Sequence, residues 1–464
     1  MSNSNYLEQE KIGKLMLKFS IPTILSLLIS ALYNIVDQIF IGNSSVGAIG
    51  NTATTIVFPL TCIALAFGLM LGDGTSAYAS LLMGEKNTKG LGKAVGTAIV
   101  TSIIISIVFC LFGFIFLEEI LTFFGARTEE ALKYSLEYGY VIMIGVPFYI
   151  IMNMLNSIIR ADGSPKIAMI SMVLGAVINI ILDAVFILAL DKGVFGAALA
   201  TIIGQIASFI VSVIYMFRTK NFKLTLKDFI PSFKMLKNIL KLGFSSFLTQ
   251  ISIVIISVSS MNMLAKYGAT SKYGANDPQA IIGIVMKVFT IVINISVGIA
   301  AGSQPIIGYN FGARRIDRVK QVYRNIVIAN IIIGVIATIL FETIPTQILQ
   351  IFGSNSANPA LYLEFGEKAM RIYLMGILFT VIQKDTAIFL QSIGSPIKAT
   401  VLSLVRDVVV IVPLTFILPI FMGIEGVLWA APISDTVSII LTVILISIEF
   451  KKINKFEKEQ EALA

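Results

Sequence analysis

The sequence has few of the residues on which soluble enzymes most often rely. It contains no histidine, two cysteines and one tryptophan, and only 13% of its 464 residues are charged. Without histidine, the side chain that usually titrates near neutral pH is missing, so any proton transfer falls to aspartate or glutamate. Two cysteines exclude a disulfide scaffold, and no cluster of metal-ligating residues is evident. These absences argue against a hydrolase or a metalloenzyme, and we expect neither enzymatic activity nor a bound cofactor.

Hydrophobic residues are abundant instead. They make up 56% of the chain, and the mean hydropathy is +0.89. A helix needs about 20 apolar residues to cross a bilayer, and the long apolar runs do not alternate in polarity as barrel strands do. The sequence therefore predicts an all-α membrane protein with twelve transmembrane helices, at residues 17–41, 52–72, 93–117, 137–159, 167–190, 194–217, 239–264, 279–302, 322–343, 370–391, 398–420 and 426–448.

A set of turn residues repeats at a spacing close to half the chain. Gly163-Ser164-Pro165 returns as Gly394-Ser395-Pro396, 231 residues later, and Gly84-Glu85-Lys86 is matched by Gly312-Ala313-Arg314, 228 residues later. In the first motif glycine can end one helix, serine can cap the next, and proline fits its first turn. We predict two pseudo-symmetric six-helix lobes around a central cleft, because carriers built from repeats commonly bind substrate between them.

The boundary between the lobes is predicted from charge. Residues 218–241 carry seven Lys and Arg between apolar runs, and we interpret them as a solvated cytoplasmic linker that faces lipid headgroups. They separate an amino-terminal lobe, residues 1–217, from a carboxy-terminal lobe with a cytoplasmic tail, residues 242–464. Most of the other Lys and Arg lie in connecting segments that would be on the same side of the membrane as the linker. This distribution predicts a multi-pass protein of the cell membrane with both termini cytoplasmic. The net charge of +8 follows this topology, so we expect no nucleic-acid partner.

Charged residues also lie well inside the predicted spans of the second half. Such charges usually face the bundle interior and have a partner, and neighbours on one helix point about 100° apart. We therefore expect Lys384 to meet Asp407, or Arg406 to meet Asp385, from another helix. The favoured interpretation is a polar network that stabilises this half, with substrate contact or proton relay as alternatives. Its members are Lys287, Lys384, Asp385, Arg406, Asp407 and Asp435.

The first half has two aspartates with no lysine or arginine near them in their predicted spans, Asp37 and Asp183. Their carboxylates must be protonated, hydrated or bound to an external cation. Asn179 precedes Asp183 by one helical turn, Tyr33 bears the same relation to Asp37, and Thr201 lies at a similar depth in the next span. Their oxygens are the ligands that hard cations prefer, so the five residues predict a proton- or sodium-binding site. Alternatively, Asp37 reaches external water, and Asn179 and Thr201 only join helices.

These residues resemble those of the multidrug and toxic compound extrusion (MATE) family, and most closely its MepA-like and DinF-like bacterial branch. The resemblance covers essentially the whole chain and is sharpest at Pro22, Tyr33, Asp37, the segment 179–183 and Thr201. It implies a monomeric antiporter that exports amphipathic, often cationic drugs across the bilayer by alternating access, driven by H⁺ or Na⁺. It also implies that the first helix bends near Pro22 when the ion site is occupied. A sodium ion at Asp37, Asn179, Asp183 and Thr201 would be the only metal.

The sequence departs from one branch of the family, and one related carrier stays open as an alternative. The NorM-like branch of the same family carries acids in its carboxy-terminal lobe, whereas residues 240–264 contain none here, and this departure puts a second ion site in doubt. A flippase of lipid-linked oligosaccharides, or another carrier of amphipathic metabolites from the same superfamily, is the nearest alternative. A major-facilitator carrier is disfavoured, because its usual charged signature between the second and third helices is missing.

Overall fold

A computed structural model describes residues 5–126, 128–274, 276–352 and 358–461. Most of these residues are helical, and none of those described lies in a β-strand, so the predicted all-α class is confirmed. The elements of the first half are α1 (Asn5–Gln9), α2 (Ile12–Gly42), α3 (Gly47–Gly84), α4 (Thr88–Ile115), α5 (Leu117–Phe123), α6 (Glu129–Ala161), α7 (Pro165–Asp183), the π-helix η1 (Ala184–Ala189), α8 (Gly193–Met216) and the 3₁₀-helix η2 (Leu226–Phe229).

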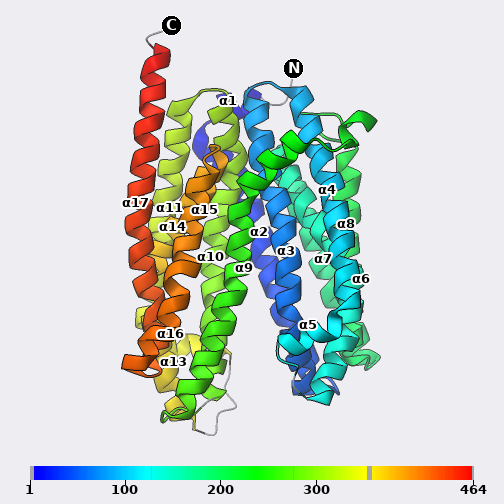
Figure 1. The fold of residues 1–464 in the computed structure, drawn as a ribbon, viewed down its shortest axis with the longest axis vertical. Coiled ribbons are helices and arrows are strands. Elements are labelled where there is room, and N and C mark those ends of the chain that lie inside the picture. Colours follow the sequence, from blue (N-terminus) through cyan, green and yellow to red (C-terminus); the bar gives the residue numbers. More distant parts are fainter. Residues whose placement is uncertain (1–4, 127, 275, 353–357, 462–464) are drawn as a thin grey trace. The chain divides into compact units, whose positions relative to one another are not determined.

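The second half follows the same order of long and short helices (Figure 1). The short helix α12 lies 228 residues after α5, the spacing at which the sequence repeats. The elements of the second half are α9 (Phe233–Ala269), α10 (Asn276–Gly312), α11 (Ile316–Thr343), α12 (Pro345–Ile351), α13 (Pro359–Tyr373), α14 (Ile377–Ser392), α15 (Pro396–Leu404), the π-helix η3 (Val405–Val410), α16 (Ile411–Met422) and α17 (Glu425–Glu461).

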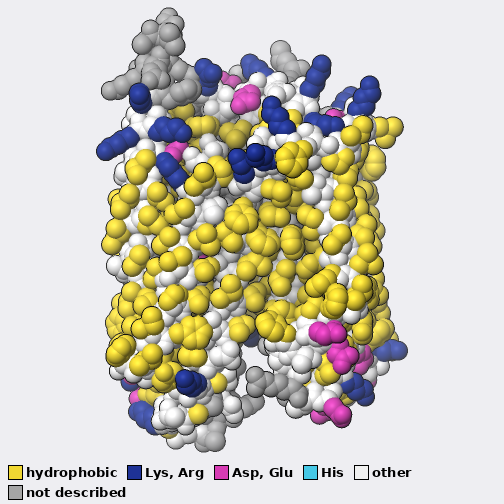
Figure 2. All heavy atoms as spheres, in the orientation of Figure 1, with side chains coloured by type: hydrophobic (Ala, Val, Ile, Leu, Met, Phe, Trp, Pro, Cys, Tyr) yellow, Lys and Arg dark blue, Asp and Glu magenta, His cyan; other side chains and the backbone are white. Residues whose placement is uncertain are grey.

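The number of membrane spans agrees with the predicted twelve. Within the described residues, eleven segments are long and apolar enough to cross a bilayer, and the pair α13 and α14 makes a twelfth if its two helices count as one span. That pair bends by 46° between Tyr373 and Ile377, so the span predicted at residues 370–391 includes a break that the sequence analysis did not predict. In each unit, hydrophobic side chains cover the middle of the helices, whereas Lys and Arg gather at an end (Figure 2). This pattern fits a multi-pass membrane protein.

The sequence repeat is present in the backbone. Gly163 and Gly394 both have positive φ, 82° and 78°, and each stands just before a helix that begins with proline. Lys86 and Arg314 also occupy the left-handed region, at 58° and 61°. Residues other than glycine rarely adopt this conformation, so its occurrence at matched positions shows that the two halves make the same turns.

The serines of the repeated motif do not act as predicted. Ser164 and Ser395 occupy the N-cap positions of α7 and α15, but neither side chain makes a capping hydrogen bond. Ser164 Oγ instead accepts a hydrogen bond from the Tyr215 hydroxyl at 2.8 Å, and Ser395 Oγ donates to Glu449 at 2.8 Å. Each serine therefore joins its turn to the last helix of its own half.

Contacts divide the chain into two compact units. The first contains Met1–Gln250, Ala301–Arg315 and Gln391–Gly394, and the second contains Ile251–Ala300, Ile316–Leu390 and Ser395–Ala464. Each has its own hydrophobic core, around Leu121 and Met143 in the first and around Phe365 and Leu428 in the second. Helices α9 and α10 contribute to both units, so the division of the sequence at 218–241 stays a prediction.

The linker is attached to the first unit by its backbone and is not a free tether. The buried carboxylate of Asp162, after α6, accepts hydrogen bonds from the backbone N–H groups of Lys220 and Asn221 at 2.7 and 2.9 Å. Further along, Lys93 of α4 donates to the carbonyl of Lys227 at 2.8 Å. The seven basic side chains of the linker remain exposed, as predicted, while its backbone is fixed to α4 and α6.

Candidate functional site

The predicted cation-site residues come from three helices of the first unit that pack together, α2, α7 and α8. Helices α7 and α8 cross at two glycines: a Cβ on Gly204 would lie 2.5 Å from the carbonyl oxygen of Gly175, and one on Gly175 would lie 2.7 Å from that of Gly204. Small residues allow such close approach. Asn179 and Thr201 flank this crossing, and Asn179 Nδ2 donates a hydrogen bond to Thr201 Oγ1 at 3.4 Å.

Asp37 and Asp183 are buried, with 8% and 0% of their surfaces exposed. Their carboxylates lie close enough to interact electrostatically, and no cation among the described residues acts on either. One oxygen of Asp37, both oxygens of Asp183 and the amide oxygen of Asn179 make no hydrogen bond of good geometry within the described residues, although the Asn179 side chain lies beside the Asp183 carboxylate. Buried oxygens normally have partners, so this group of four suits neutralisation by a proton or a small cation.

Two tyrosines complete the surroundings of these acids. Tyr33 lies one turn before Asp37 on α2 and is half-buried, and it interacts electrostatically with both aspartates. Tyr138 of α6 also interacts with both acids, and only 8% of it is exposed. The sequence analysis did not single out Tyr138, because nothing in its own helix distinguishes it from an interfacial tyrosine. We call Tyr33, Asp37, Asn179, Asp183 and Thr201 the amino-half site.

A π-helical turn begins directly after Asp183. The segment η1 continues α7, and Leu190 N donates to Val185 O at 2.9 Å, the spacing of a π-helix. In such a turn the helix is wider than an α-helix, and π-turns occur frequently at functional sites. Asp183 therefore occupies the junction between an α-helix and a π-helix.

Pro22 lies inside α2, which continues through it from Ile12 to Gly42. Proline has no N–H group, so the helix lacks one backbone hydrogen bond at this position. The hydroxyl of Ser26 donates to the carbonyl of Pro22 at 2.8 Å, and that of Thr23 donates to the carbonyl of Phe19 at 2.9 Å. Ser and Thr hydroxyls that bond back to a carbonyl one turn earlier often bend helices, and these two lie about three and four turns before Asp37.

The charged residues of the second unit form a connected cluster. Lys384 Nζ lies 3.3 Å from Asp407 Oδ2, the first of the two pairings that the sequence offered. Arg406 does not meet Asp385: it pairs with Asp407 and with Asp435, at 2.8 Å from the latter, and it donates to Thr380 at 3.2 Å. The π-helix η3 carries both Arg406 and Asp407. Each buried charge in this cluster has an opposite charge beside it.

Two residues of the expected network lie outside the cluster. Asp385 is buried and accepts hydrogen bonds from Ser296 at 3.1 Å and from Asn330. It forms no ion pair with a described residue, although Lys384 interacts with it electrostatically. Lys287 of α10 is half-buried and forms no ion pair within the described residues. The predicted polar network is therefore only partly present: four of its six residues, Lys384, Arg406, Asp407 and Asp435, form one cluster.

A second polar cluster of the first unit was missed. Asp73 of α3 accepts hydrogen bonds from Ser157 and Ser246, both at 3.0 Å, and Arg160 lies 3.9 Å from it. The predicted spans ended at residues 72 and 159, one residue before Asp73 and before Arg160, so the pair was assigned to connecting segments. In the structure α3 and α6 continue past both residues. The glycines on either side of Asp73 were a signal of close helix packing that hydropathy does not record.

Comparison with known proteins matches residues 22–185 and 246–417 to the family described as MatE. The chain is 27% identical over 452 residues to the multidrug export protein MepA of Staphylococcus saprophyticus, and 27% identical over 442 residues to that of Staphylococcus aureus strain MRSA252. Each of these alignments covers 95% of both chains. A crystal structure of a MATE protein in complex with MaL6 superposes with a TM-score of 0.89 at 24% identity, covering 98% of this chain and 100% of the other.

Proposed function

We propose, given that this chain belongs to the MatE family, that it exports amphipathic, often cationic drugs in exchange for H⁺ or Na⁺, with the ion bound at the amino-half site. The relatives named multidrug export protein MepA align over nearly their whole length, which supports drugs as the substrate class. The observation that carries ion coupling is the group of four buried oxygens without partners on Asp37, Asn179 and Asp183.

The chemistry of these oxygens fits a small hard cation. Carboxylate, amide and hydroxyl oxygens coordinate such ions, and Thr201 adds a hydroxyl beside the amide of Asn179. A proton would satisfy the same acids differently, because a protonated carboxyl donates one hydrogen bond and carries no charge. Either ion removes the cost of burying uncompensated negative charge. Among the described residues, no basic side chain neutralises Asp37 or Asp183 in its place.

Ion binding would couple to helix packing because the two acids come from different helices. A cation between Asp37 and Asp183 draws α2 and α7 together, whereas two ionised carboxylates repel each other. Pro22 and the π-turn after Asp183 are the positions at which α2 and α7 yield most easily. An ion that binds one packing arrangement better shifts the population toward it.

Antiport then requires only that ion and drug prefer different states of the protein. If the ion favours a state in which drug binds weakly, linkage requires that drug weakens ion binding equally. Uptake of the ion from outside then releases the drug there. We propose that the protein works as a monomer with both termini in the cytoplasm, an orientation that the distribution of basic residues supports.

The test is transport by purified protein in proteoliposomes loaded with a fluorescent lipophilic cation. We expect an imposed Na⁺ or H⁺ gradient to drive transport, and Asp37→Asn and Asp183→Asn each to reduce the gradient-driven rate by about tenfold or more, because each removes a charge-assisted ligand. Asp191→Asn is the matched control, since Asp191 is exposed eight residues beyond Asp183 and asparagine tolerates its φ of 46°.

Two results would contradict the proposal. If neither the Na⁺ gradient nor the H⁺ gradient accelerates transport of the dye, antiport by this protein is excluded. Gradient-driven transport that both variants retain at the control's rate would leave drug export intact and exclude the amino-half site as its ion site. Replacing Na⁺ by choline, and collapsing the pH gradient separately, distinguishes sodium from proton coupling.

A further inference from the structure

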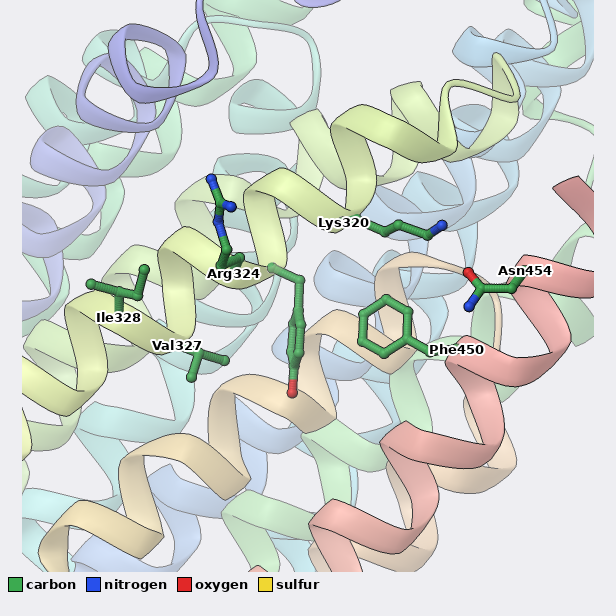
Figure 3. Close-up of a pocket in the computed structure, with 7 residues that line it drawn as sticks. Lys320, Arg324, Val327, Ile328, Phe450 and Asn454 are labelled. Atoms are coloured by element: carbon green, nitrogen blue, oxygen red, sulfur yellow. The ribbon is translucent and has the colours of Figure 1, made fainter.

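A groove of about 450 Å³ lies between α11 and α17 of the second unit (Figure 3). No acidic side chain lines it. In Figure 3, Lys320 extends from α11 toward Asn454 of α17, and the ring of Phe450 lies between the two helices. The residues that line the groove are Lys320, Tyr323, Arg324, Val327, Ile328, Phe450 and Asn454.

The groove changes from cationic to apolar along α11. Lys320 and Arg324 are one helical turn apart and so share a face, and Val327 and Ile328 occupy the next turn. The aromatic wall is made by Tyr323 and Phe450, whose ring centroids are 5.4 Å apart. A molecule bound here would place an anionic group at one end and a hydrocarbon chain at the other.

Arg324 provides positive charge at the polar end of the groove. Arg324 is exposed, and its guanidinium forms no ion pair with any residue that the structure describes. A guanidinium suits phosphate because it can donate two parallel hydrogen bonds. The ammonium of Lys320 and the side-chain amide of Asn454 line the same end of the groove, so this end carries three hydrogen-bond donor groups.

The apolar end continues into surface that a bilayer would cover. Ile328, Ile331 and Ile332 of α11 are 49%, 42% and 54% exposed, and Ile444 and Ile448 of α17 are each 50% exposed. By helical rise, Arg324 lies about 12 Å from the first residue of α11. Because α11 has 28 residues, longer than a hydrocarbon core of about 30 Å requires, Arg324 falls near the depth of lipid headgroups.

From this placement of two cations above an apolar groove we propose that α11 and α17 hold an anionic glycerophospholipid of the leaflet at the basic end of the helices. Its phosphate binds Lys320, Arg324 and Asn454, and one acyl chain lies along Val327, Ile328 and the ring of Phe450. Basic pockets between transmembrane helices bind such headgroups in other membrane proteins. The site is separate from the amino-half site and does not depend on which ion drives transport.

The experiment uses the single tryptophan of the chain. Trp429→Phe removes it, and Phe450→Trp places a fluorophore in the groove while keeping an aromatic wall. The full-length double variant is reconstituted in nanodiscs that contain phosphatidylglycerol or phosphatidylcholine brominated in the acyl chain. We expect brominated phosphatidylglycerol to quench the fluorescence several-fold more strongly at equal mole fraction.

Arg324→Gln in this background tests the charge. We expect the preference for phosphatidylglycerol to fall about fivefold, as for the loss of one basic residue at a membrane surface, and Arg324→Lys to retain most of it. Arg218→Gln is the matched control, because Arg218 is also exposed and basic but lies in the linker. Equal quenching by the two lipids, or the same loss of preference in Arg218→Gln as in Arg324→Gln, would overturn the proposal.

Discussion

Lys384 Nζ lies 3.3 Å from Asp407 Oδ2, so this acid of the second unit has a cationic partner, whereas no described residue provides one for Asp183 of the first unit. The two halves share their turns and helix order, yet they bury charge in different ways. In the second unit the acids of the central cluster are neutralised by the protein itself. For Asp37 and Asp183 of the first unit, no described residue supplies the opposite charge, which is why we propose ion binding at these two acids.

The first prediction compares the two kinds of buried acid by thermal unfolding in detergent without Na⁺ at neutral pH. Asp407→Asn leaves Lys384 and Arg406 with less compensation, so we expect a loss of about 3 kcal/mol in the free energy of unfolding, as for breaking a buried ion pair. Asp183→Asn removes an uncompensated acid, so we expect no loss or a small gain. Equal destabilisation by the two variants would show that Asp183 is paired as firmly as Asp407.

The second prediction concerns the glycine crossing of α7 and α8. Gly204→Ala places a methyl group 2.5 Å from the carbonyl oxygen of Gly175, and a backbone atom cannot move aside as a flexible side chain can. We expect a loss of about 1–3 kcal/mol in the free energy of unfolding and weaker ion coupling, because the crossing sets the contact of Asn179 with Thr201.

Gly283→Ala is the control for that substitution. Gly283 lies in α10, and no atom lies within 4 Å of the position that its Cβ would take. Alanine there should keep or slightly raise stability, since it favours helix over glycine. If the two alanine variants unfold at the same temperature, the close approach at Gly175 does not limit packing.

The third prediction is that the coupling ion stabilises the protein by binding its folded state. If sodium is the ion, the unfolding temperature should rise when NaCl replaces choline chloride. At a Na⁺ concentration one hundred times the dissociation constant, the free energy of unfolding should increase by about 2.7 kcal/mol. The increment should disappear in Asp183→Asn and persist in Asp191→Asn. If the proton is the ion, the same pattern should appear on lowering the pH without Na⁺.

If Asp183→Asn keeps the full rise in unfolding temperature both on adding Na⁺ and on lowering the pH, the ion binds elsewhere in the protein. Asp385 would then be the first residue to test, since it is a buried acid of the second unit for which no ion pair is found within the described residues. Its existing hydrogen bonds from Ser296 and Asn330 make it less suited to coordinate an added cation than the free oxygens of Asp183.

The fourth prediction concerns the attachment of the linker. Asp162→Asn replaces a carboxylate that accepts the N–H groups of Lys220 and Asn221 by an amide with a single acceptor oxygen. We expect the backbone amides of Lys220 and Asn221 to exchange hydrogen faster. The free energy of local opening should fall by about 1.5–3 kcal/mol, the contribution of a charge-assisted hydrogen bond. Amides in the middle of α8 should be unchanged, and unchanged exchange at Lys220 and Asn221 would contradict the role of Asp162.

Much of the fold could be predicted because it depends on local patterns. Span positions follow from runs of apolar residues, and the repeated turns follow from glycine and proline at matched spacing. The bend between α13 and α14 could not be predicted this way, since hydropathy is continuous through it. Nor could the roles of Ser164 and Ser395, whose partners Tyr215 and Glu449 lie more than 50 residues away.

For the charged residues well inside the predicted spans, the sequence by itself determined that they must be shielded from lipid and which acids have no cation near them in their own helices, because helix length and depth depend only on residue order. Only the tertiary structure decided that Arg406 pairs with Asp435, that Asp385 receives hydrogen bonds from Ser296, and that two glycines bring α7 against α8. These contacts join helices distant in sequence. A single chain's residue pattern does not record which helix faces are brought together in space.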